Sequence, residues 1–115
     1  MLRGEIWEVD FIPARDNEAN KRRPAVVVSN DRANATASRL GRGVVTVVPV
    51  TSNIASVYPF QVFLPSATTG LAVDSKAQAE QIRSVSTERL RRRIGRVPPA
   101  ELAQLDQALR LHLEL

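Results

Sequence analysis

The chain has 115 residues, enough for one domain with one modest hydrophobic core. It holds no cysteine and a single histidine, His112, so disulfides, thiolate metal sites and multi-histidine metal sites within one chain are excluded, and we expect no metal or other cofactor. No segment approaches the roughly 20 apolar residues that span a bilayer, and the charged N-terminus lacks the apolar stretch of a secretory signal, which predicts a cytoplasmic protein.

Basic residues are concentrated in the middle of the chain. Residues 21–96 hold 13 of the 16 Lys and Arg residues and only four acids, whereas the rest of the chain is acidic. Fourteen of the 16 are arginine, whose planar fork donates two parallel hydrogen bonds to phosphate. This favours a polyanionic partner, with nucleic acid first, although an arginine-biased genome and an ordinary solvated surface explain the same composition.

The chain begins with two predicted strands and a long loop between them. Apolar and charged residues alternate over 5–12, which is typical of a half-buried strand. Residues 13–23 are polar and open with a proline, so they predict an exposed loop. Pro24 then starts a β-branched strand that we expect to be buried on both faces.

A short helical turn and the strongest strand signal follow. Residues 30–31 (Asn-Asp) can cap a turn that ends near residue 37, and 38–43 indicates a turn. Residues 44–51 are rich in valine and predict a strand. Its interior Pro49 indicates an edge, a bulge or a bend.

The second half of the chain predicts further short strands. In order they are a strand at 57–64, a hairpin-like turn at 66–70, one or two strands within 71–85, a helical turn at 86–90 and a short strand at 94–97. Residues 98–115 predict a helix, because prolines and Glu101 open it and Leu102, Leu105 and Leu109 form one apolar stripe. The fold class expected is a small, strongly curved, mostly antiparallel β domain with a C-terminal helix.

Several short blocks, in the same order, resemble MazF/PemK toxins. RGEIW at 3–7 is similar to the opening of these toxins, and Arg23-Pro24 leads into a strand as it does in the family. The other matching blocks are VPVTS at 48–52, YPF at 58–60, EQIRS at 80–84, Arg89-Leu90 and Ile94-Gly95. Together they span nearly the whole chain, and the arginine-rich and alanine-rich style looks most like the mycobacterial branch.

This resemblance implies one toxin domain over residues 1–115, with an SH3-like and CcdB-like β-barrel carrying short helices. It implies a type II toxin–antitoxin system, a homodimer with an RNA groove along its interface, and a cognate MazE-type antitoxin whose disordered tail occupies that groove. The implied activity is a metal-independent, sequence-specific endoribonuclease (an mRNA interferase) that cuts single-stranded RNA and thereby inhibits translation and growth.

RNA can be cut without metal because it carries its own nucleophile. The 2′-hydroxyl attacks the neighbouring phosphorus and leaves a 2′,3′-cyclic phosphate and a 5′-hydroxyl. The enzyme then supplies a base, cationic donors for the phosphorane and a proton source for the leaving oxygen. A pair of histidines, the usual acid and base, is absent from this chain.

Arg23 is the candidate for the phosphorane, because its guanidinium can bind both non-bridging oxygens. It matches the catalytic arginine of the family's Arg-Pro motif, and the alternative is a salt-bridged surface arginine. Thr51 matches the family's catalytic threonine, and its hydroxyl can hydrogen-bond the phosphate or the 2′-hydroxyl. The alternative for Thr51 is an ordinary strand-end residue.

Glu18 matches a loop glutamate of the family's Ser-Glu pair, in which Asn17 replaces the serine. A glutamate beside phosphates can act as a general base, or it can accept hydrogen bonds from a nucleobase. Asp16 replaces a common family glycine, which puts the loop's conformation in doubt.

Further residues are candidates for RNA binding only. These are Asn17, Lys21, Arg22, Ser52, Asn53, Tyr58, Gln81 and Arg83. Lys21 and Arg22 would position phosphates, and Tyr58 would stack on a base, unless it is a core residue of its predicted strand. Gln81 and Arg83, on the predicted EQIRS strand, and the basic run at 89–93 have the same two interpretations, binding or structural.

Two other function classes remain open. A gyrase poison of the CcdB type shares the expected fold but has no need of Arg23 and Thr51. A binding-only barrel would hold RNA or antitoxin without cutting.

Overall fold

The computed structural model describes residues 1–11 and 22–115. In these residues the elements run β1 (Glu5–Asp10), β2 (Arg22–Val27), α1 (Asp31–Leu40), β3 (Val44–Thr51), β4 (Gln61–Leu64), α2 (Ser66–Thr69), β5 (Ser75–Gln78), η1 (Ala79–Gln81), β6 (Arg83–Ser86), η2 (Thr87–Arg89), β7 (Leu90–Arg96) and α3 (Pro99–Leu113). The elements η1 and η2 are single 3-10 turns. The candidates Asn17, Glu18 and Lys21 lie outside the described residues.

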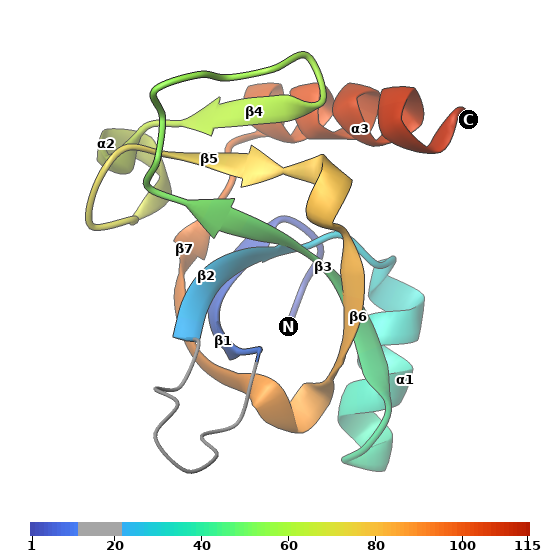
Figure 1. Cartoon of the computed structure of the whole chain (residues 1–115). Coiled ribbons are helices and arrows are strands. Elements are labelled where there is room, and N and C mark those ends of the chain that lie inside the picture. Colours follow the sequence, from blue (N-terminus) through green and yellow to red (C-terminus); the bar gives the residue numbers. More distant parts are fainter. Residues whose placement is uncertain (12–21) are drawn as a thin grey trace, which may run out of the picture.

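The described strands form one antiparallel sheet in the order β4-β5-β3-β2-β1-β7, with β6 beside β3. Figure 1 looks into the curled part of this sheet, where β1, β2, β3, β6 and β7 surround a common interior. The strands β4 and β5 continue the sheet outside this ring, next to α3. The expected barrel-like, mostly β fold with a C-terminal helix is confirmed.

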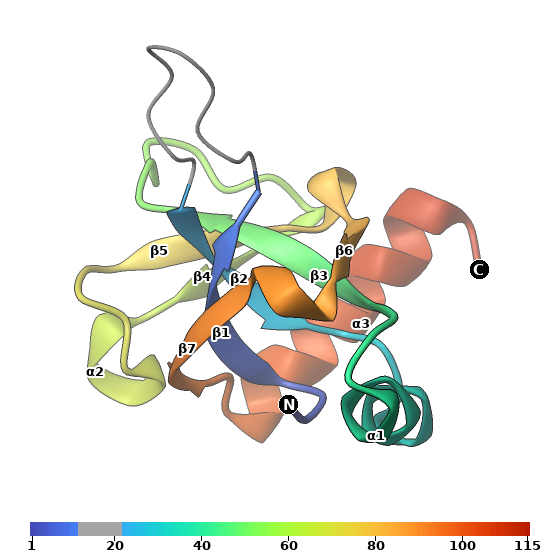
Figure 2. The same ribbon diagram turned by 90° about the horizontal axis from the view of Figure 1, so that it is seen from below.

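Two hydrophobic cores lie on opposite sides of β2 and β3. Val26 and Val48 belong to a core that the helix α3 covers, whereas Val27 and Val47 face the interior of the ring. Figure 2 shows α3 packed along one side of the sheet. Because successive side chains of a strand point to opposite faces, a strand between two cores needs an unbroken apolar run. The prediction that the strand after Pro24 is buried on both faces is therefore confirmed for β2.

The apolar stripe of α3 packs against the sheet as predicted. Leu105 is fully buried, Leu109 is buried and Leu102 packs partly against the same core. Three later leucines are exposed instead: Leu111, Leu113 and Leu115. Among the helices described, α3 included, none is long and apolar enough to cross a membrane.

Pro49 marks a change of partner strand within β3. On one side, β6 pairs with Val44–Val47 and β5 pairs with Val50 and Thr51. Pro49 lies in the gap between the two ladders, where a missing N–H breaks no pairing on that side. The proline therefore allows a central strand to carry two partners in succession.

Two early elements differ from the prediction. β2 begins at Arg22 and not at Pro24, because Arg22 and Arg23 pair with Asp10 and Val9 of β1. The helix α1 is three residues longer than expected: Asn30 does cap it by accepting a hydrogen bond from the Ala33 N–H, but it ends only at Gly41 in the left-handed conformation.

Four later elements also differ. β4 is limited to 61–64, because residues 57–60 precede it as a turn in which the Gln61 N–H donates to the Tyr58 carbonyl. Residues 66–69 form the helical turn α2, closed by Gly70, and not a hairpin turn. Residues 79–81 form η1, and β7 starts at Leu90 because β1 pairs with it from there.

Gly95 allows β7 to pass directly against α2. A Cβ atom at Gly95 would lie 1.8 Å from the carbonyl oxygen of Thr69. We expect Gly95→Ala to reduce the free energy of unfolding by about 3 kcal/mol, because the backbone must move apart. Urea denaturation checks this beside Gly41→Ala, whose Cβ meets nothing within 4 Å but whose φ of 67° strains an alanine, so that variant should lose only about 1 kcal/mol. An unchanged midpoint for Gly95→Ala would show that α2 adapts freely.

Candidate active site

Arg23 and Thr51 line the same pocket. It has a volume of about 290 Å³ and lies where β2 begins and β3 ends, with Ser52, Leu71 and Ser75 also in its wall. Arg23 is exposed and Thr51 is half-buried. Residues separated by a helix and most of a strand in the sequence are thus neighbours at one solvent-accessible site.

The strand register explains why these two side chains meet. Ala25 of β2 is paired with Pro49 of β3, and the same antiparallel register, continued by two residues, sets Arg23 opposite Thr51. Directly opposite residues of antiparallel strands present their side chains on the same face. The face that carries both side chains is turned away from α3, and we call it the polar face.

The neighbouring strand β5 extends the polar face. Thr51 is paired with Lys76 on β5, and Gln78 lies two residues further along the same strand, on the same face. Arg23 Nη2 donates a hydrogen bond of 3.2 Å to Gln78 Oε1. The guanidinium therefore reaches across β3 and is oriented by an amide from a third strand.

A second polar contact chain lies next to Gln78. Gln61 on β4 is paired with Gln78, its Nε2 donates to Glu80 Oε2 at 2.7 Å, and its Oε1 accepts the Tyr58 N–H at 3.1 Å. The other carboxylate oxygen of Glu80 is buried, and within the described part of the chain it has no hydrogen-bond partner. Glu80 thus places a carboxylate beside the polar face, and by accepting this hydrogen bond it orients the side chain of Gln61.

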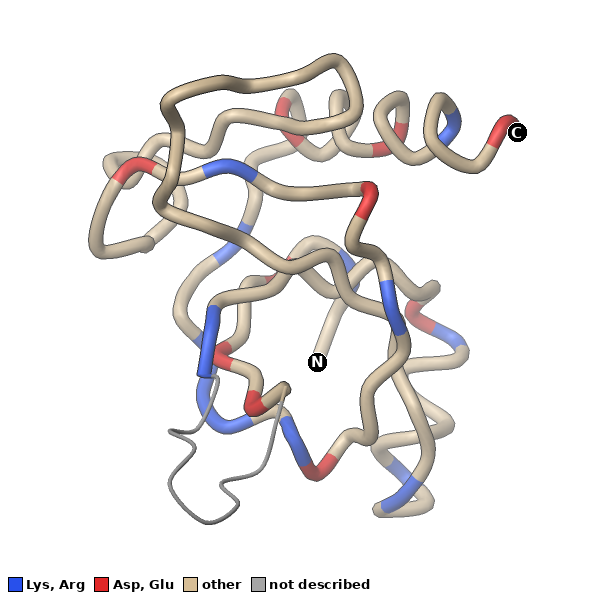
Figure 3. The backbone as a smooth tube through the Cα atoms, viewed as in Figure 1, with Lys and Arg blue, Asp and Glu red and all other residues tan. Residues whose placement is uncertain are grey.

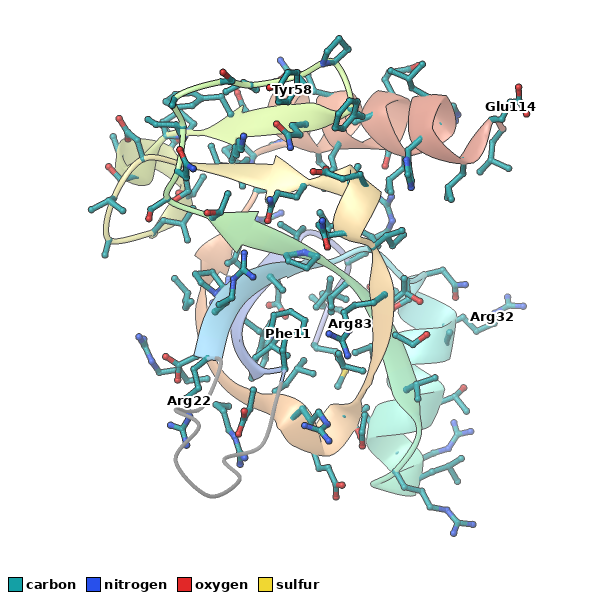
Figure 4. All side chains as sticks on the ribbon, in the orientation of Figure 1. Phe11, Arg22, Arg32, Tyr58, Arg83 and Glu114 are labelled. Carbon is teal, nitrogen blue, oxygen red and sulfur yellow. The ribbon has the colours of Figure 1, made fainter. Side chains whose placement is uncertain are left out.

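The segment 52–60 joins β3 to β4 and carries three of the candidate residues. Thr51 Oγ1 accepts the Asn53 N–H at 3.2 Å, and Asn53 Oδ1 accepts the Ala55 N–H at 3.3 Å. Ser52 and Asn53 are exposed directly after Thr51. Tyr58 is 53% exposed, so the interpretation of Tyr58 as a core residue of a strand is wrong: it lies in an irregular segment near the surface (Figure 4).

Gln81 and Arg83 lie further along the sheet. Gln81 is exposed in η1, and not in a strand as predicted. Arg83 on β6 is paired with Val47, four residues from Thr51 along β3, which corresponds to about 13 Å. Its guanidinium lies 5.1 Å from the ring of Phe11, and Figure 4 shows both at the mouth of the curled sheet. Arg83 is therefore part of the barrel mouth and not of the Arg23 pocket.

Comparison with known proteins decides the family. The model of the PemK-like, MazF-like toxins of type II toxin–antitoxin systems matches residues 2–113. The chain belongs to this toxin family.

Relatives in the family include one of high identity. Endoribonuclease MazF9 of Mycobacterium tuberculosis is 77% identical over 115 residues, which cover 100% of this chain and 98% of the relative. Among solved structures, MazF of Deinococcus radiodurans is 28% identical with a TM-score of 0.77, over 100% of this chain and 97% of that one. A MazE–MazF structure from the same organism is 27% identical with a TM-score of 0.77, over 100% and 96%. The resemblance to the mycobacterial branch of the family is confirmed.

The basic run of this toxin at 89–93 is engaged with the acids of β1. Three ion pairs join the two strands: Arg91 with Asp10 at 3.1 Å, Arg92 with Glu8 at 3.8 Å and Arg93 with Glu5 at 2.9 Å. Figure 3 shows the acidic stretches of β1 beside the basic stretches of β7. These contacts favour the structural interpretation of the run.

The pKa of the Glu5 carboxyl is lowered by the contacts around it. Its burial acts to raise the pKa, but the Leu2 N–H, the Trp7 indole N–H and the charge of Arg93 lower the pKa of the carboxyl below its ordinary value. Glu5 is therefore held ionised and paired, as a residue that joins β1 to β7.

The site residues that the sequence of this toxin predicts do not include Lys76, Gln78, Gln61 or Glu80. Lys76 and Gln78 alternate with Ser75 and Ala77, which is the one local signal that they share a face. Which face that is depends on the pairing of β5 with β3, a contact between residues more than 20 positions apart. Arg22, the neighbour of Arg23 in β2, points to the opposite face by the same alternation and so does not enter the pocket from the side of Arg23.

Proposed function

We propose that this chain is an endoribonuclease toxin that cuts single-stranded RNA at a short recognition sequence and thereby inhibits translation and growth. Membership of the family and the high identity to a relative named as an endoribonuclease support this proposal. The observation that carries it is the pocket that Arg23 and Thr51 share. A gyrase poison or a binding-only barrel gives no reason for a guanidinium and a hydroxyl to converge there.

The proposed reaction uses the 2′-hydroxyl of the RNA as nucleophile. A bond forms between the 2′-oxygen and phosphorus, the bond from phosphorus to the 5′-oxygen breaks, and the products carry a 2′,3′-cyclic phosphate and a 5′-hydroxyl. The 2′-hydroxyl proton passes to a base, for which we propose Glu18, and the 5′-oxygen receives a proton as it leaves. No metal ion is required in this scheme.

Arg23 is suited to the charge that develops on the phosphorane. A guanidinium has five N–H donors, and the one hydrogen bond that Arg23 makes within the described part of the chain, to Gln78, leaves others for the non-bridging oxygens. Because Gln78 already orients the fork, little reorganisation is needed as the charge develops, which is the condition for strong electrostatic catalysis. Thr51 would donate its hydroxyl proton to the phosphate or hold the 2′-hydroxyl.

RNA binding is proposed for the remaining candidates. Ser52 and Asn53 follow Thr51 directly and are exposed, so they are suited to nucleobase edges. Tyr58 would stack on a base. Lys21, Arg22 and Arg83 would bind phosphates, and Asn17 and Gln81 would hydrogen-bond the RNA.

We further infer that residues 1–115 act as one domain in a homodimer and bind a cognate MazE-type antitoxin in the cytoplasm, where the RNA substrate is found. The MazE–MazF structure similar to this chain supports the antitoxin partner. The exposed leucines at the end of α3 support a second subunit, since three large apolar side chains close together in the sequence are otherwise left in water.

Incubation of the purified protein with a long single-stranded RNA in EDTA tests the proposed function. We expect discrete fragments with cyclic-phosphate and 5′-hydroxyl ends. Covalent gyrase–DNA adducts without RNA cleavage would instead support a gyrase poison. RNA binding without cleavage would support a non-catalytic barrel.

A further inference from the structure

Lys76 is a buried cation on the polar face. The residue is only 7% exposed, although lysine is among the residues least often buried without a partner. The ion pairs found in residues 1–11 and 22–115 do not include Lys76. Its burial is therefore compensated by contacts other than a carboxylate.

Among the residues that the structure describes, the two polar contacts of the Lys76 side chain are with the segment 52–60. Its Nζ donates a hydrogen bond of 2.5 Å to the carbonyl oxygen of Ser56 and lies 5.7 Å from the centroid of the Tyr58 ring. The segment contains no helix or strand, and Ile54, Val57 and Tyr58 expose apolar surface. The segment is thus weakly packed on its own, and side chains from the sheet hold it in place. One of them is Lys76, which contacts two residues of the segment, Ser56 and Tyr58.

Lys76 also lies opposite Thr51, the residue from which the segment departs. The two Cα atoms are partners in the ladder between β3 and β5. Because Lys76 belongs to β5, its hydrogen bond to Ser56 holds the middle of the segment against β5, beside the end of β3 that carries Thr51. This fixes where the segment runs relative to the proposed catalytic hydroxyl.

We infer that Lys76 is a positioning residue, which clamps the segment 52–60 across the polar face so that the Tyr58 ring forms a stacking platform for a nucleobase beside the scissile phosphate. Tyr58 and Phe60 stack with a centroid distance of 5.5 Å and an interplanar angle of 10°, so Phe60 supports the Tyr58 ring while Tyr58 stays 53% exposed to a base. Sequence-tolerant binding of single strands uses aromatic rings of this kind. The inference rests on the proposed ribonuclease function, and Lys76 acts through Tyr58 and not on the RNA itself.

Lys76→Met is the variant that tests the clamp. Methionine retains a long, flexible side chain but removes the charge and the donor, and the desolvation cost of a buried charge that it spares offsets the loss of the contact with Ser56. Arg39→Met on α1 is a control that removes the same charge at an exposed position that does not line the pocket of Arg23 and Thr51. Lys76→Arg retains a positive charge and a hydrogen-bond donor at this position.

The kinetic test uses an oligonucleotide that contains the cleavage site mapped on a long RNA. We expect Lys76→Met to raise KM about tenfold, the scale of losing one stacked base, with kcat within about twofold because Arg23 and Thr51 are untouched. Lys76→Arg should recover most of this loss, and Arg39→Met should behave as the wild type. Tyr58→Ala should raise KM about tenfold in the wild type but less than about twofold in Lys76→Met, since the two side chains act as one unit.

Additive effects of the Lys76 and Tyr58 substitutions, a loss confined to kcat, or an unchanged KM would each overturn the clamp. Hydrogen exchange of the Tyr58 amide, measured without RNA, separates this inference from the proposed function. We expect exchange about tenfold faster in Lys76→Met, because the segment opens more often. If the wild type cuts no RNA but exchange accelerates, the ribonuclease proposal fails and the clamp stands as a structural device. Unchanged exchange overturns the clamp itself.

Discussion

Arg23→Ala should reduce the rate of RNA cleavage by about 100-fold or more, the usual effect of removing one preorganised donor from a developing oxyanion. The side chain is exposed, and its one hydrogen bond to the described residues is to Gln78, so the fold should be unaffected. The loss should appear mainly in kcat, because the guanidinium is proposed to bind the phosphorane more strongly than the ground-state phosphate. Single-turnover cleavage of an oligonucleotide that contains the mapped site measures it.

Two neighbouring variants make the Arg23 result specific. Arg22→Ala removes the same charge from the same strand but from the opposite face, and we expect only a modest rise in KM. Arg23→Lys keeps the charge but loses the planar fork, and should remain well below the wild type. Wild-type rates for Arg23→Ala would remove this residue from the mechanism.

Thr51→Val should reduce cleavage by about 10-fold to 100-fold, because it keeps the branched shape that suits a strand end and removes only the hydroxyl. Thr51 Oγ1 also accepts the Asn53 N–H, so part of the loss could come from a disturbed turn. Thr51→Ser keeps the hydroxyl for both roles and should retain most of the activity. Full activity of Thr51→Val together with a loss for Thr51→Ser would show that the methyl group matters and the hydroxyl does not.

The strands that hold the site were predictable from local patterns. The composition of the valine runs predicts β2 and β3, and the motifs that contain Arg23 and Thr51 identify these two residues as candidates. Their meeting was not predictable in this way, because it follows from the pairing of Ala25 with Pro49, a contact across 24 positions. A motif can identify a residue, but only the register identifies its neighbours.

The errors of the sequence analysis come from segments where tertiary contacts outweigh local preference. The aromatic run at 57–60 has strand composition, but it forms a turn closed by the Gln61 N–H and held by the Gln61 side chain. Nothing in the sequence marks Lys76 as a buried residue, because a single lysine in a short strand is usually solvated. Its burial depends on a segment 20 residues earlier in the chain. The basic run at 89–93 looked free in the sequence because the β1 acids that pair with it lie about 80 positions away.

The central claim is that the RNA supplies the nucleophile while Arg23 and Thr51 stabilise its attack. Its most direct measurement compares two oligonucleotides with the mapped cleavage site, one all-ribose and one with a single 2′-deoxy residue at the scissile position. We expect equal binding, full cleavage of the first in EDTA to a 2′,3′-cyclic phosphate, and no cleavage of the second. Cleavage of the 2′-deoxy oligonucleotide at the same bond would contradict it, because the nucleophile would then have to come from elsewhere.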